Sequence, residues 1–225
     1  VRAEVYALNA FLSLAAVASL TVGPPNARRL GCAGLLTGLG LANHHLLTLA
    51  AVAPAVLVVL PGRSWARRLA PAVAMGTLGL LSYALLPLRA LADPVVNWGD
   101  PRTAGRFLWT VSAEVFRRFR GDAAPASLAD SAAEAGFVLM DALGALGALV
   151  ALIGLGLLIR RAPREGGAVF AAAGSVVATK VVMGFDPHNP DLLGYWLPAI
   201  LLGGVGVASS LGLVRLVAPR GGAVA

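Results

Sequence analysis

Long runs of apolar residues, separated by short polar or proline-rich breaks, dominate the chain. The runs are rich in Ala, Leu, Val and Gly, and they lack the alternation of apolar and polar positions that is typical of a half-buried strand. Runs that are apolar on every side predict membrane-spanning helices. The seven predicted spans are residues 4–21, 30–43, 46–60, 69–88, 136–159, 168–183 and 194–214.

The second and third runs are each shorter than the roughly 20 residues that a full membrane crossing needs. They meet at the polar sequence Asn43, His44 and His45. We expect two short spans with a turn at these residues, and the alternative is one bent re-entrant pair. Small residues in the second run predict close packing against a neighbouring helix. They are Gly31, Gly34, Gly38 and Gly40.

Residues 92–135 form the longest polar stretch of the sequence, which we expect to be an extracytoplasmic loop. Phe107, Val111, Val115 and Phe119 recur within it at helical spacing, and arginines flank this stripe. The pattern predicts an interfacial amphipathic helix over residues 103–120. Residues 121–135 are expected to lead as a loop to the fifth span.

The composition agrees with a membrane protein. Hydrophobic residues make up 58% of the 225 residues and charged residues only 13%, against about 25% charged residues in soluble domains. We predict an all-α, polytopic helical membrane protein with about seven transmembrane helices, forming a single membrane domain over residues 1–225. The chain has one cysteine, Cys32, which excludes a disulfide framework and a thiolate metal site.

The net charge of +7 does not indicate nucleic-acid binding. The arginines form short clusters between apolar runs, whereas a nucleic-acid-binding protein carries them on one soluble face. These clusters occupy every second connection between the predicted spans, which places them on the cytoplasmic side by the positive-inside rule. The clusters are Arg28/Arg29, Arg63/Arg67/Arg68, Arg160/Arg161/Arg164 and Arg215/Arg220.

The same alternation places the remaining unusual polar residues on the outer face. A membrane protein that gathers such groups at one interface is expected to have a functional site there. The residues are Glu4, His44, His45, Arg89, Asn97, Trp98, Asp100, Asp186, His188, Asp191 and Tyr195.

Glu4, His44 and His45 are the candidate catalytic residues. An acid within a membrane helix is costly to keep, which favours a role in a site, although Glu4 suits an interfacial position equally well. Two adjacent histidines on a helix point in different directions, so one metal ion rarely binds both. The alternative interpretation of His44 and His45 is that they mark the end of a span.

Arg89 is a candidate phosphate ligand, because its guanidinium is planar and permanently charged. It lies on the side where positive charge has no orienting role, and the alternative is snorkelling to lipid headgroups. Residues 97–101, Asn-Trp-Gly-Asp-Pro, suit a substrate-binding loop or an Asx-type turn with an interfacial Trp.

Asp186 and Asp191 suit a proline-rich turn or, as the alternative, a divalent cation. Their spacing matches no specific metal loop, so we assign no metal ligand and no certain cofactor. Tyr195 is typical of an aromatic belt at the membrane interface.

Four blocks of the sequence together resemble a family of multi-spanning membrane proteins related to a eukaryotic transmembrane protein O-mannosyltransferase. The family belongs to the GT-C glycosyltransferases, and many of its bacterial members have no known function. The most specific block is Pro87-Leu88-Arg89 followed by residues 97–101. The others are Glu4-Val5-Tyr6, residues 38–45 ending in Asn43-His44-His45, and Asp191 with Gly194-Tyr195-Trp196.

The resemblance implies an integral protein of the bacterial inner membrane that transfers a sugar from a polyprenyl-phosphate donor to a protein or glycan acceptor on the extracytoplasmic side. Arg89 would then contact the lipid phosphate, and Asn43, Asn97, Trp98, Asp100, Asp191 and Tyr195 would bind substrate. The family carries its catalytic acid in an Asp-Ser-Gly-Glu-like segment before the Glu-Val-Tyr block. This sequence has no such segment, so we expect a C-terminal fragment of the membrane domain, and the alternative is an inactive remnant. The alternative function is a transporter or lipid-handling protein, for which polar groups at mid-span are expected.

Overall fold

The computed structural model describes residues 2–60, 65–97, 99–112, 114, 127–183 and 192–217. This part of the chain is helical and contains no strand, which confirms the all-α prediction. The helices are α1 (Arg2–Thr21), α2 (Ala27–Val59), α3 (Trp65–Leu80), the 3-10 helix η1 (Leu81–Ala84), α4 (Leu85–Leu91), α5 (Ala104–Val111), α7 (Leu128–Arg161), α8 (Pro163–Met183) and α9 (Leu192–Val217).

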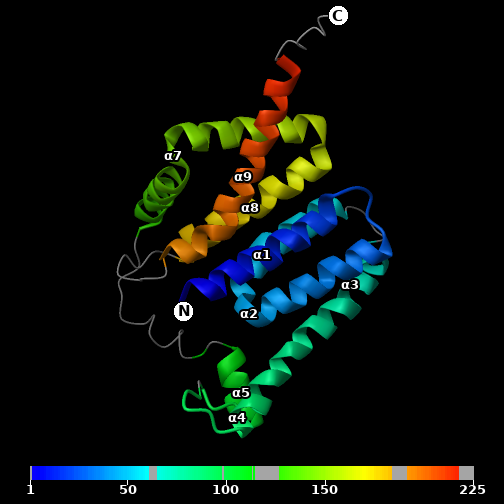
Figure 1. Cartoon of the computed structure of the whole chain (residues 1–225), viewed down its shortest axis with the longest axis vertical. Helices are drawn as coiled ribbons and strands as arrows, with labels where there is room; N and C mark the ends of the chain where they lie inside the picture. Colours follow the sequence, from blue (N-terminus) through cyan, green and yellow to red (C-terminus); the bar gives the residue numbers. More distant parts are fainter. Residues whose placement is uncertain are drawn as a thin grey trace, which may run out of the picture.

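Helix α2 is a hairpin of two arms rather than one straight rod. The backbone of His44 leaves helical geometry, with φ −153° and ψ 88°, at the position where the sequence predicts a turn. The two arms lie side by side and run in opposite directions (Figure 1). A Cβ on Gly40 would lie 2.8 Å from Oγ1 of Thr48, so the arms touch next to the turn. The break at Asn43–His45 is therefore confirmed, and the number of membrane crossings remains a prediction.

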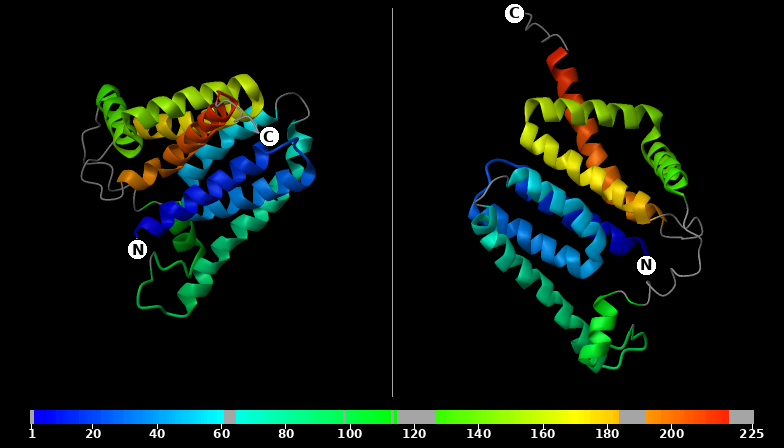
Figure 2. Two further views of the ribbon diagram at one scale, coloured as in Figure 1. Left: turned by 45° about the horizontal axis from the view of Figure 1, so that its top comes forward. Right: turned by 180° about the vertical axis from the view of Figure 1, so that it is seen from behind.

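Helix α3 packs against α2 at Gly34 and Gly38, two of the small residues for which we predicted close packing. A Cβ on Gly34 would lie 2.0 Å from the backbone oxygen of Ala72, and one on Gly38 would lie 2.1 Å from that of Gly76. Only glycine permits backbones this close. Helix α3 then runs through η1 into α4, away from α7, α8 and α9 (Figure 2).

A helix begins where the interfacial helix was predicted, and its position at a membrane surface stays a prediction. Thr103 caps α5 by accepting a hydrogen bond from the backbone N–H of Arg106, at 3.3 Å. Helix α5 ends at Val111, and most of the remaining predicted helix, residues 115–120, lies outside the described residues.

Helix α7 begins earlier than the sequence indicated, because residues 128–135 are helical and not part of a loop. Ser127 caps the helix by accepting from the backbone N–H of Asp130 at 3.1 Å, and its hydroxyl donates to Oδ2 of Asp130 at 2.6 Å. The predicted span 136–159 is also broken, because Gly144 has φ 70° and ψ 157°. This region of the backbone map is essentially restricted to glycine.

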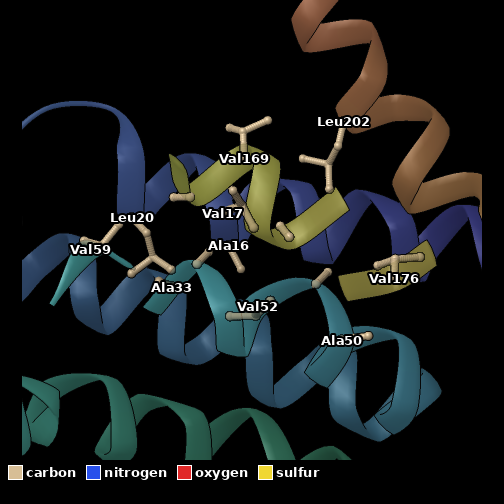
Figure 3. Close-up of a cluster of buried hydrophobic side chains, with 14 of the residues drawn as sticks. Ala16, Val17, Leu20, Ala33, Ala50, Val52, Val59, Val169, Val176 and Leu202 are labelled. Carbon is tan, nitrogen blue, oxygen red and sulfur yellow. The ribbon is translucent and has the colours of Figure 1, made fainter. Parts of the chain in front are cut away.

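The main core lies where α1, both arms of α2, α8 and α9 meet (Figure 3). It consists mainly of Ala, Val and Leu, including Ala16, Leu20, Val52, Val176 and Leu202. Many large apolar side chains point outward instead, for example Phe137, which is 77% exposed. Four helical stretches are long and apolar enough to cross a membrane, namely Ala27–Val59, Arg67–Leu91, Leu128–Arg161 and Pro163–Met183. The protein therefore has the character of a helical membrane protein.

The helices give the described part of the chain two distinct ends. We call one of them the arginine end. It contains the turn 22–26, next to Arg28 and Arg29, and the α7–α8 turn with Arg160, Arg161 and Arg164. The two turns are in contact, because the guanidinium of Arg164 donates a hydrogen bond to the backbone oxygen of Gly23. The other, the polar end, holds the α2 break, the start of α1 and the start of α9 (Figure 1). Within the described residues, Asn43, His44 and Tyr195 are thus separated along the helix axes from the arginines of these two turns.

Candidate functional site

Three aromatic rings from α1, α2 and α9 meet at the polar end. The ring centroids of Tyr6 and Tyr195 lie 5.0 Å apart, those of Tyr6 and His44 5.8 Å, and those of His44 and Tyr195 5.6 Å in an edge-to-face arrangement. We call these three residues the aromatic cluster. It brings two residues predicted for the site, His44 and Tyr195, into contact, although they are 151 positions apart.

Lys180 of α8 adds a positive charge to the aromatic cluster. Its Nζ lies 4.2 Å from the centre of the Tyr195 ring, within the range of a cation–π contact. The residue is only 7% exposed although it lies in the last turn of α8. A cation this deeply buried lies where charges interact more strongly than they do in water.

Asn9 of α1 forms hydrogen bonds with residues on both sides of the α2 break. Its Nδ2 donates to Oγ1 of Thr48 at 2.8 Å, to the backbone oxygen of Gly40 at 3.2 Å and to that of His44 at 3.3 Å. The carbonyls at a helix break have lost their normal partners. Asn9 is completely buried and supplies a donor to these groups from a third helical segment.

Asn43 and His44 are oriented by separate hydrogen bonds. Nδ2 of Asn43 donates to the backbone oxygen of Val5 at 3.1 Å, which joins the break to α1. Nδ1 of His44 accepts from the backbone N–H of Leu47 at 3.5 Å. A neutral imidazole that accepts at Nδ1 carries its hydrogen on Nε2, so His44 presents a donor at the far side of its ring.

A second polar group lies in the connection between α4 and α5. Nδ2 of Asn97 donates to Oδ1 of Asp100 at 2.7 Å, and Nε of Arg102 donates to the same oxygen at 2.9 Å. Arg102 also forms an ion pair with Asp93. We call Asp93, Asn97, Asp100 and Arg102 the polar turn. Two of its residues, Asp93 and Asp100, have positive φ, and so does Gly99.

The polar turn is held against α5 and joined indirectly to the α2 break. A Cβ on Gly99 would lie 2.3 Å from Oγ1 of Thr110, so this position admits only glycine. Tyr83 of η1 donates its hydroxyl to the backbone oxygen of Leu41 at 2.9 Å, and its ring packs edge-to-face against Phe107 of α5. Tyr83 thus spans from the first arm of α2 to the helix that follows the polar turn.

Other predicted site residues do not join either group. Arg89 is exposed in the last turn of α4 and has no hydrogen bond or ion pair within the described part of the chain. His45 is exposed, with its ring centroid 6.3 Å from that of His44. Glu4 lies in the first turns of α1, but the structure does not describe its side chain. Trp98 and Asp191 lie outside the described residues.

The residues that the structure describes contain no group of three or more His, Cys, Asp or Glu side chains placed to hold a metal ion. The carboxylates of the polar turn, Asp93 and Asp100, are both paired with Arg102. An arginine so placed satisfies the negative charge that a cation would otherwise neutralise.

The site also contains three residues that we did not predict from the sequence, namely Tyr6, Asn9 and Lys180. Tyr6 and Asn9 lie three positions apart and Ser13 follows four later, so the three share one face of an otherwise apolar helix. That polar stripe is the signal that identifies this face of α1. For Lys180 the signal is a charge inside an apolar run.

Comparison of the chain with protein-family models, with curated proteins and with solved structures found no match.

Proposed function

We propose that this protein acts as a membrane glycosyltransferase that moves a sugar from a polyprenyl-phosphate donor to a protein or glycan acceptor at the outer face of the bacterial inner membrane. The proposal rests on the resemblance of four sequence blocks to the O-mannosyltransferase-like family. One structural observation supports it most: aromatic rings, an imidazole and a buried ammonium from α1, α2, α8 and α9 meet at the polar end.

The chemistry of the aromatic cluster suits the phosphate group of a lipid-linked sugar. Lys180 supplies a positive charge in a region of low dielectric constant, where its attraction to a phosphate is stronger than in water. Nε2 of His44 supplies a hydrogen-bond donor. Tyr6 and Tyr195 offer apolar ring faces with polar rims to the neighbouring parts of the ligand.

Arg89 and the polar turn have separate roles in this proposal. The resemblance assigns the guanidinium of Arg89, which is exposed at the end of α4, to the lipid phosphate. The polar turn is held rigid by its internal ion pairs and by the contact of Gly99 with Thr110. It forms the wall against which the sugar or the acceptor is positioned.

The buried polar side chains favour a transferase over a transporter. A transport path needs polar groups that face a continuous route through the middle of the helices. Asn9 instead donates hydrogen bonds to Thr48 and to the backbone of α2. These hydrogen bonds stabilise the helix break and do not line a path.

The test is sugar transfer from radiolabelled polyprenyl-phosphate mannose in membranes that contain the full-length protein. Arg89→Ala and Lys180→Met each remove a charge-assisted contact to phosphate, worth about 1.5–3 kcal/mol, so we expect transfer to fall roughly 10- to 100-fold. Arg67→Ala is the matched control, because Arg67 is an exposed arginine near the start of α3, far along the helix from Arg89.

Full transfer by Arg89→Ala and Lys180→Met at unchanged expression would remove both residues from the mechanism. If the unaltered protein transfers no sugar but moves a labelled lipid or solute across reconstituted vesicles, the transporter assignment replaces the proposal.

A further inference from the structure

A pocket of about 500 Å³ lies at the arginine end, at the opposite end of the helices from the aromatic cluster. It is formed by the end of α1, the turn 22–26 and the start of α2. Its lining combines small or apolar groups with two guanidinium groups. The lining residues are Ala18, Ser19, Val22, Asn26, Arg28, Arg29 and Cys32.

The two arginines leave the pocket with positive charge that the described protein does not neutralise. Arg28 is exposed, and neither arginine forms an ion pair within the described residues. Nη1 of Arg29 is buried and has no hydrogen-bond partner there. A buried donor without an acceptor is destabilising, and a ligand with anionic oxygens would supply the missing acceptor.

The guanidinium of Arg29 lies against the backbone of the turn 22–26. A Cβ on Gly23 would lie 2.5 Å from Nη1 of Arg29, so the guanidinium packs directly against the glycine. Nη2 of Arg164 donates to the backbone oxygens of Gly23 and Leu20, at 3.2 and 3.3 Å. Arg164 thereby holds the rim of the pocket without lining it.

The apolar part of the pocket lining forms a wall that is suited to hydrocarbon. Val22 is 65% exposed, and Ala18 and Cys32 are exposed beside it. Ala18 and Cys32 belong to helices whose outward faces are apolar, and Val22 directly follows α1, so this wall continues the surface that faces lipid.

We propose that this pocket binds the headgroup of an anionic phospholipid. The phosphate contacts Arg28 and Arg29, and an acyl chain follows the wall formed by Ala18, Val22 and Cys32. Charge complementarity identifies the headgroup, because basic pockets between transmembrane helices bind anionic lipid headgroups. The apolar wall favours a lipid over a free phosphate compound. This binding site is independent of the transferase activity proposed above.

Cys32 lines the pocket and is exposed, so its alkylation reports directly on occupancy of the pocket. The full-length protein is placed in nanodiscs of phosphatidylcholine alone or with added phosphatidylglycerol, and alkylation of Cys32 by N-ethylmaleimide is timed by mass spectrometry. A bound lipid shields Cys32, so we expect alkylation to be at least about fivefold slower with phosphatidylglycerol, since [L]/Kd of 4 leaves one fifth of the pocket empty.

A matched pair of variants separates the pocket from general surface charge. The double variant Arg28→Ala/Arg29→Ala lacks the pocket cations. Its rate of Cys32 alkylation should be the same in the two lipid compositions. Arg160→Ala with Arg161→Ala removes two exposed arginines at the same end that do not line the pocket, and should preserve the difference. The proposal is wrong if both pairs behave alike, or if phosphatidylglycerol does not slow alkylation of the unaltered protein.

Soluble glycerol 1-phosphate, added to the phosphatidylcholine nanodiscs, distinguishes the source of the phosphate. We expect it to leave the rate of alkylation unchanged at millimolar concentration. Protection equal to that by phosphatidylglycerol would overturn the lipid assignment in favour of a free phosphate compound.

Discussion

Asn9 joins α1 to both arms of α2 through a single side-chain amide. Its three acceptors come from the end of the first arm, the break itself and the start of the second arm. The hydrogen bonds of such a buried donor contribute more to the stability of a membrane helix bundle than those on a surface do, because no water competes for the same carbonyls. The shape of the aromatic cluster therefore depends on a residue that does not belong to it.

Replacement of Asn9 by Ala is expected to destabilise the protein by about 1–3 kcal/mol, since it leaves buried acceptors unpaired. The measurement is thermal unfolding in detergent, followed by circular dichroism. Ser13→Ala is the control on the same helix face, because Ser13 is also buried but its Oγ has no hydrogen-bond partner. We expect that change to be neutral or slightly stabilising.

An equal loss of stability in Asn9→Ala and Ser13→Ala would show that packing volume, and not the hydrogen bonds of Asn9, holds the α2 break.

Helices α2 and α3 are joined by backbone contact rather than by large side chains. Gly34 and Gly38 lie against the backbone of Ala72 and Gly76, so van der Waals attraction between the two backbones replaces the interdigitation of long side chains. This makes the α2–α3 interface sensitive to any side chain added along the glycine stripe.

Gly34→Val should separate α2 from α3, because its Cβ would lie 2.0 Å from the oxygen of Ala72. Overpacking of this kind costs about 1–3 kcal/mol or more, measured as a lower midpoint of thermal unfolding. Gly156→Val in α7 controls for the poor helix propensity of Val, since nothing lies within 4 Å of a Cβ at that position. If Gly156→Val lowers the midpoint as far as Gly34→Val does, the close contact is not the cause.

The elements differ in how far the sequence predicted them. The break at Asn43–His45 was predictable because polar residues interrupt an apolar run. The break at Gly144 was not, because glycines within membrane helices more often serve close packing than positive φ. The early start of α7 depends on the Ser127–Asp130 cap, a short local signal that lies within a stretch of Ala and Asp residues.

The site was predictable only in part, for a related physical reason. Single residues such as His44 and Tyr195 stand out because polar or aromatic groups are unusual at span ends. Their contact with Tyr6 and Lys180 depends on how four helices pack, which no local pattern specifies. Arg89 and the polar turn adjoin in sequence, yet the described contacts do not link them.

At the scale of the whole molecule, the arginines of the turns around residues 22–29 and 160–164 lie at one end of the described helices, and the aromatic cluster lies at the other. The arginine clusters predict a cytoplasmic arginine end, and the polar end would then face outward. This arrangement is testable with single cysteines in a Cys32→Ser background. Val95→Cys lies in the polar turn connection and Pro24→Cys in the turn 22–26, and both positions are exposed.

A membrane-impermeant maleimide applied to intact spheroplasts should label Val95→Cys and leave Pro24→Cys unlabelled until the membrane is opened. The positive-inside rule requires this result for short basic connections. The opposite labelling pattern would invert the orientation and place the aromatic cluster at the cytoplasmic face.

Arg164 bonds to Leu20 and Gly23 across 144 and 141 positions of the chain. Synthesis proceeds from the N-terminus, so α1 and α2 are complete long before residue 164 leaves the ribosome. Until then, water or lipid headgroups must satisfy the two carbonyls that Arg164 later occupies. The turn between the first two helices therefore reaches its final form late in biogenesis, when α8 docks.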